Sequence, residues 1–135
     1  MPIGPVLLDT SILEALVAQD PKVLAALDAC ASREARFFLS VLSRLEFRAE
    51  LPKCAFPLAW APLDGEAAVA AGKMRYLLGE RDPEDELMPL AMIAGTAHAI
   101  GASLLVASDE RMAVFKQLLA TIKSKSPLVD ARRGR

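Results

Sequence analysis

The chain has 135 residues, which suits one domain of ordinary size with a core of its own. Its apolar fraction is 53% and its aromatic fraction is 5%, so we expect an aliphatic core. The formal net charge of -1 excludes a strongly basic surface. A nucleic-acid partner would therefore have to be held by a local patch or through a metal ion.

The same composition argues against a membrane protein. No stretch approaches the roughly 18 uninterrupted apolar residues of a membrane span, and the first residues lack the basic region of a signal peptide. Cys30 and Cys54 are isolated and lack the spacing of metal ligands. We expect them to be reduced thiols of a cytoplasmic protein that has no contact with a membrane.

The first apolar stretch is Val6-Leu7-Leu8, and it runs directly into Asp9. Three apolar residues in a row are typical of a strand that is covered on both faces. In an open α/β sheet, ligands bind in the crevice beyond the carboxyl ends of the strands, where Asp9 would lie. The alternative is that Asp9 or Thr10 simply caps the helix that follows.

Strands and helices alternate along the rest of the chain. The patterns predict a first helix that ends at about residue 18, a second that starts at Asp20-Pro21, and a third that starts at Ser40 and is ended by Pro52. Three more helices are predicted over 65–78, 88–100 and 110–122, and strands at 37–39, 59–61 and 104–106. This order predicts a three-layer α/β/α fold with a central parallel sheet. Residues 1–125 would form a single domain, and 126–135 either an edge strand or a mobile basic tail.

Small residues mark two of these helices. Gly72, within the helix at 65–78, suggests close packing at some cost in helix propensity. Ala91, Ala94, Gly95 and Ala97 give the helix at 88–100 a face that can lie close on a sheet.

A second junction repeats the first one. Leu104-Leu105-Val106 is followed by Ser108 and Asp109, and then by a helix. Two parallel strands that each end on an acid place those acids at the same edge, so Asp9 and Asp109 form a predicted pair. Glu46 lies within the third predicted helix, where a solvated acid is the simpler interpretation.

Three types of active site were compared with these junctions. The turns lack the glycines of a dinucleotide or phosphate-binding loop, and Ser11 stands where an aspartyl-phosphate enzyme would have its second Asp. A hard cation such as Mg²⁺ or Mn²⁺ needs several oxygen ligands from separate elements. The residues that fit this requirement are Asp9, Glu46 and Asp109, with lesser oxygen donors at Thr10, Ser11 or Ser108.

These motifs together resemble a PIN domain of the VapC type, the small ribonucleases of toxin–antitoxin pairs. The matching segments cover roughly residues 5 to 120 and are Leu7 to Ser11, Ser40 to Glu46, Ile93 to Ala97, and Leu104 to Asp109. The resemblance implies that Asp9, Glu46 and Asp109 bind one or two Mg²⁺ or Mn²⁺ ions, with Ser11 as an accessory polar residue. It also implies metal-assisted hydrolysis of RNA phosphodiesters, a cognate antitoxin and a homodimer.

One position departs from the family pattern. Members usually carry an Asp three residues before the Ile of the Ile93 segment, and here that position is Leu90. Because Leu cannot bind a hard cation, either Asp85 or Glu86 reaches the site or one ligand is missing. Two functions follow: an active metal-dependent ribonuclease toxin, or a catalytically impaired PIN-fold protein that binds RNA or a protein.

Overall fold

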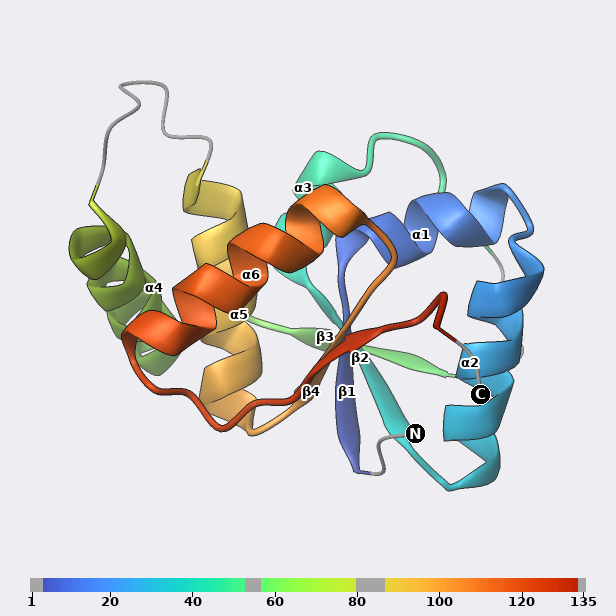
Figure 1. Cartoon of the computed structure of the whole chain (residues 1–135). Coiled ribbons are helices and arrows are strands. Elements are labelled where there is room, and N and C mark those ends of the chain that lie inside the picture. Colours follow the sequence, from blue (N-terminus) through green and yellow to red (C-terminus); the bar gives the residue numbers. More distant parts are fainter. Residues whose placement is uncertain (1–3, 53–56, 80–86, 134–135) are drawn as a thin grey trace.

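Five parallel strands form a central sheet in the computed structural model, which describes residues 4–52, 57–79 and 87–133. The strand order is β3-β2-β1-β4-β5, and the bounds are β1 (Pro5–Leu8), β2 (Arg36–Ser40), β3 (Leu58–Ala61), β4 (Ser103–Val106) and β5 (Leu128–Asp130). The helices are α1 (Thr10–Val17), α2 (Pro21–Ser32), α3 (Val41–Glu46), α4 (Gly65–Leu78), α5 (Leu87–Ile100) and α6 (Asp109–Thr121). This confirms the predicted three-layer α/β/α fold (Figure 1).

The two faces of the sheet are covered by different helices. Successive strand residues point to opposite faces, so Leu7 packs with α4, α5 and α6, whereas Leu8 packs with α1 and α2. All four residues of β4 are buried. Figure 1 shows α4, α5 and α6 on one side of the sheet and α1 and α2 on the other. The continuous apolar strands of the sequence are explained by this burial on both faces.

The parallel arrangement brings three strand ends to one edge. Leu8, the last residue of β1, pairs with Leu39 of β2 and Leu105 of β4. The backbone N–H of Asp9 donates to the Leu105 carbonyl at 3.0 Å and fixes the chain as it leaves the strand. The segments that enter α1, α3 and α6 therefore start from the same edge of the sheet.

Helix α3 is shorter than predicted, because Glu46 is its last residue and Pro52 plays no part in ending it. The backbone turns extended at Phe47, whose N–H still donates to the Ser43 carbonyl. Arg44 Nη1 donates to the carbonyls of Phe47 and Ala49 at 2.9 and 3.2 Å. These contacts satisfy carbonyls beyond the helix end, so the chain can leave α3 early, with Glu46 at its terminus.

The predicted roles of the small residues need correction. A Cβ built on Gly95 would lie 2.6 Å from the Ala67 carbonyl oxygen, so Gly95 allows α5 to approach α4 and not the sheet. A Cβ on Gly72 would meet nothing within 4 Å, so no close packing requires that glycine. The prediction of close packing was therefore right for Gly95, with α4 as its neighbour, and wrong for Gly72.

The C-terminal segment adds β5, which pairs in parallel with β4 at the edge of the sheet. The Ala131 N–H continues this pairing by donating to the Val106 carbonyl at 2.8 Å. Within the described ranges, no helix is both long and apolar enough to pass through a bilayer.

Candidate site at the carboxyl edge of the sheet

Asp9 leaves β1 as the N-cap of α1, and its side chain is fully buried. Its Oδ2 accepts hydrogen bonds from the Ser11 backbone N–H at 3.1 Å and the Ser11 hydroxyl at 2.7 Å. The Ser11 hydroxyl oxygen in turn accepts from the Ala107 N–H at 2.9 Å, just beyond β4. Asp9 thus caps the helix, as one alternative proposed, and Ser11 links its carboxylate to the neighbouring strand end.

Glu46 reaches the same place from the end of α3. The Thr10 hydroxyl donates to Glu46 Oε1 at 2.6 Å and lies 3.1 Å from the Ser43 hydroxyl, which is buried. The Glu46 side chain keeps 24% of its surface exposed. Glu46 is therefore part of the site and not a solvated helix acid, because the short α3 ends beside the first residue of α1.

A cation that the sequence analysis did not identify joins the two acids. Arg111, in the first turn of α6, donates from Nε to Asp9 Oδ2 at 2.8 Å and from Nη2 to Asp9 Oδ1 at 2.7 Å. It also donates from Nη2 to Glu46 Oε1 at 3.0 Å and from Nη1 to Glu46 Oε2 at 3.3 Å. We call Asp9, Glu46 and Arg111 the inner cluster.

The rest of α6 holds the guanidinium in position. The Arg111 guanidinium carbon lies 5.7 Å from the centre of the Phe115 ring, one helical turn later, and Phe115 is fully buried. Burial lowers the pKa of Arg111, but hydrogen bonds and charge from Asp9 and Glu46 outweigh it, so the pKa rises above its ordinary value. Arg111 is consequently a permanent cation at this site.

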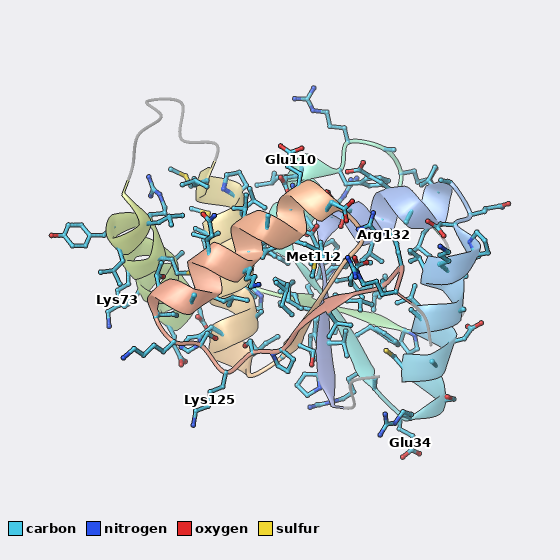
Figure 2. The ribbon with its side chains drawn as sticks, viewed as in Figure 1. Glu34, Lys73, Glu110, Met112, Lys125 and Arg132 are labelled. Carbon is cyan, nitrogen blue, oxygen red and sulfur yellow. The ribbon has the colours of Figure 1, made fainter. Side chains whose placement is uncertain are left out.

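Asp109, the third predicted ligand, turns away from the inner cluster. Its side chain is 85% exposed and pairs with Arg132, which also pairs with Asp130 at 3.0 Å. Figure 2 shows Arg132 beside the amino end of α6. Hydrogen bonds from Arg132 outweigh burial and lower the pKa of the Asp130 carboxyl. We call Asp109, Asp130 and Arg132 the outer cluster.

The other predicted ligand positions do not add an acid. Leu90 is partly buried and packs against the apolar core on the side of α4, α5 and α6. Asp85 and Glu86, the predicted substitutes, lie outside the described residues. Across the ranges that the structure describes, no group of three or more His, Cys, Asp or Glu side chains could hold a metal ion.

The donor set does not fit a divalent cation in this arrangement. Asp9 and Glu46 offer the hard oxygens that Mg²⁺ and Mn²⁺ prefer. However, the guanidinium lies on both carboxylates, and Asp109 faces Arg132. The carboxylates are hydrogen-bond acceptors of a fixed cation here, so no hydrolytic step can be derived from them.

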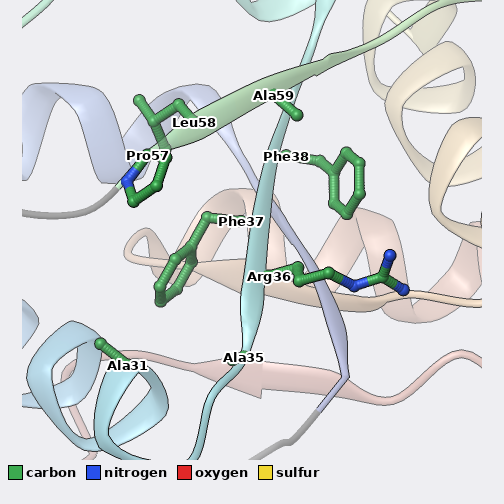
Figure 3. Close-up of a pocket in the computed structure, with 8 residues that line it drawn as sticks. All are labelled: Ala31, Ala35, Arg36, Phe37, Phe38, Pro57, Leu58 and Ala59. Carbon is green, nitrogen blue, oxygen red and sulfur yellow. The ribbon is translucent and has the colours of Figure 1, made fainter.

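An apolar pocket of about 460 Å³ lies at the opposite end of the sheet, where β2 and β3 begin (Figure 3). Phe37 and Phe38 point to opposite sides of β2 in that view, and among the described residues that line the pocket Arg36 is the charged one. None of the described residues that line it is an Asp or Glu, and it lies at the other end of the strands from Asp9, so it adds nothing to the predicted site.

Two solved structures are similar to this chain over nearly its whole length. A chain from the structure of FitAB bound to an IR36 DNA fragment matches with a TM-score of 0.63 and 17% identity, over 96% of this chain and 97% of that chain. A chain from the crystal structure of VapBC2 from Rickettsia felis, bound to a promoter DNA fragment, matches with a TM-score of 0.64 and 14% identity, over 93% and 98%. No family model matches the sequence, and no curated protein matches it. The chain therefore has a PIN/VapC-like fold, as the motifs implied.

Proposed function

We propose that this chain is the toxin-type component of a type II toxin–antitoxin pair and that it acts through binding a cognate antitoxin protein. The observation that carries the proposal is the likeness along the whole length of both chains to FitAB and VapBC2. Those two complexes are bound to DNA, and the ordered sequence motifs independently resemble VapC-type toxins. Fold and motifs thus support the same class of partner.

Exposed apolar side chains favour protein contacts. Val69, Tyr76 and Leu77 are all exposed on α4. They lie four before, three after and four after Lys73, so they share its face of the helix, and Figure 2 shows Lys73 pointing away from the molecule. A face of this composition is typical of an interface. We assign it to the homodimer that the resemblance implies.

The test is to co-express the chain with the protein encoded by the adjoining reading frame and to measure masses by size-exclusion chromatography with light scattering. We expect the chain alone to elute at about twice 14.5 kDa, and a stable larger complex with its partner. Leu77→Lys should break the homodimer, whereas Leu24→Lys, an exposed leucine on α2, should leave it intact. A monomer that binds no partner contradicts the proposal.

A metal-dependent ribonuclease of the same pair is the second candidate. It is favoured by the convergence of Asp9 and Glu46 at the carboxyl edge of a parallel sheet, where ligands bind in such folds. Leu90 and Arg111 count against it. Its test is cleavage of single-stranded RNA in Mn²⁺ by the wild type and by Asp9→Asn, with Leu90→Asp as the variant that supplies the missing acid. RNA cleavage that Asp9→Asn abolishes supports this candidate, and intact RNA with the wild type counts against it.

A further inference from the structure

The geometry of the inner cluster points to an arginine in the role of a resident cation. We infer that Arg111 takes the position that a divalent ion would occupy, and that Asp9 and Glu46 take up no Mg²⁺ or Mn²⁺ while Arg111 is in place. This inference goes beyond the proposed function, because it concerns the chain alone and requires no antitoxin.

Asp9 already accepts four hydrogen bonds, three of them on Oδ2. An ionised carboxylate offers about four lone-pair sites. Oδ2 accepts from the Ser11 N–H, the Ser11 hydroxyl and Arg111 Nε, and Oδ1 accepts from Arg111 Nη2. A cation that bridged Asp9 and Glu46 would have to displace the planar two-bond contact of Arg111 with Asp9, which is the strong form of this interaction.

The net negative charge of the inner cluster is small, so it attracts a divalent ion only weakly. Asp9 and Glu46 contribute two negative charges and Arg111 one positive charge. The third Asp of the pattern that the sequence resembles is replaced by Leu90, so the site has one acid fewer than that pattern and holds the cation Arg111. Carboxylates held close together repel one another, and a bound divalent ion offsets that repulsion. Arg111 already offsets most of it, so less is gained when a divalent ion binds.

The direction of Asp109 follows from the same helix. Residues two apart on an α-helix are separated by about 200°, so they face opposite sides. Arg111 points toward Asp9, and Asp109 therefore points toward Arg132. One orientation of α6 cannot present both side chains to the inner cluster, and the structure has the arginine inside.

The test measures Mn²⁺ binding by isothermal titration calorimetry together with thermal unfolding in the presence and absence of Mn²⁺. The wild type should show no micromolar binding and no shift in Tm. Arg111→Met, which keeps an unbranched apolar side chain but removes the guanidinium, should bind Mn²⁺ at least about tenfold more tightly than the wild type. Its Tm should fall without metal and recover with Mn²⁺.

Two controls locate the effect, and a second variant covers a failure to fold. Arg132→Met removes the matched arginine of the outer cluster and should gain no Mn²⁺ binding. The double variant Asp9→Asn with Arg111→Met should lose the binding that Arg111→Met gained. If Arg111→Met fails to fold even with Mn²⁺, Arg111→Lys is used, whose single ammonium group cannot make the two-bond contact; it should still bind Mn²⁺ more tightly than the wild type.

Micromolar Mn²⁺ binding by the wild type overturns the inference, whatever the variants do. Equal Mn²⁺ affinities in the wild type and in the folded Arg111 variant overturn it as well. Neither result affects antitoxin binding, so failure here is distinguishable from failure of the proposed function.

Discussion

The inner and outer clusters use the same chemistry in different surroundings. The inner cluster has one arginine and two carboxylates. The outer cluster has two carboxylates and Arg132, and its buried Asp130 also pairs with Arg133 at 3.4 Å. The inner cluster lies where β1, α3 and α6 meet, and its Asp9 is fully buried. The outer cluster lies beside the edge strand β5, and its Asp109 is 85% exposed. An exposed ion pair contributes little to stability, whereas removing one partner of a buried pair leaves the other charge without compensation. The inner cluster should therefore govern stability.

The largest expected effect comes from removing the inner arginine. Arg111→Met leaves Asp9 as a buried charge without its cation, and should lower the free energy of unfolding by about 3–5 kcal/mol. Arg132→Met should lower it by about 1 kcal/mol at most, because Asp109 is exposed and the buried Asp130 keeps its contact with Arg133. Urea unfolding of both variants measures the difference, and equal losses would remove the distinction between the clusters.

A smaller loss should follow when the inner carboxylate loses a single hydrogen-bond donor. Ser11→Ala removes the hydroxyl that donates to Asp9 and accepts from the Ala107 N–H. The expected cost is about 1–3 kcal/mol, since two polar groups lose a partner. Ser32→Ala is the matched control: its hydroxyl contacts a carbonyl at an exposed position, and the change should stay within about 0.5 kcal/mol. A similar loss in both variants would show that Ser11 has no special role.

Salt should separate the two clusters further. At about 1 M NaCl the Debye length is only about 3 Å, and exposed charges are screened more strongly than buried ones. The stability difference between the wild type and Arg132→Met should shrink in high salt, while that of Arg111→Met persists. Urea unfolding at low and high salt tests this, and it fails if both differences shrink alike.

The smallest effect concerns pH and the outer cluster. Hydrogen bonds from Arg132 lower the pKa of Asp130 in the folded protein, so Asp130 contributes stability above its unfolded pKa of about 3.9. That contribution should be lost as the pH falls through the folded pKa. The stability advantage of the wild type over Asp130→Asn should be constant near neutral pH and decline in acid. Thermal unfolding across the acid range measures it, and an advantage that grows in acid would reverse the assigned sign.

The sequence predicted the sheet because its signals are local. Each buried strand is a short apolar segment, and Asp9 and Asp109 mark the strand-to-helix junctions. Asp9 lies where it was predicted because a strand end and a cap fix it from both sides. Asp109 was expected beside it, but a junction fixes only the backbone. The rotation of α6 decides where the side chain points, and that rotation follows from packing.

Glu46 and Arg111 show what the local pattern could not give. Glu46 contacts Thr10 because α3 ends early. The Arg44 side chain donates a hydrogen bond to the Phe47 carbonyl just beyond that end. Arg111 had a weak signal in its spacing: it follows Asp109 by two residues and precedes the buried Phe115 by four. Leu90, at a position where the resemblance expects an Asp, also argued against a complete metal site. Considering Arg111 together with Leu90 would have suggested a cation near the two acids.

The most direct measurement is a crystal structure of the wild-type protein soaked in Mn²⁺, with an anomalous difference map at the carboxyl edge of the sheet. The account predicts no anomalous peak between Asp9 and Glu46, and density for the Arg111 guanidinium on both carboxylates. A manganese peak on those two side chains, with Arg111 displaced, would contradict it and would favour the metal-dependent ribonuclease as the function.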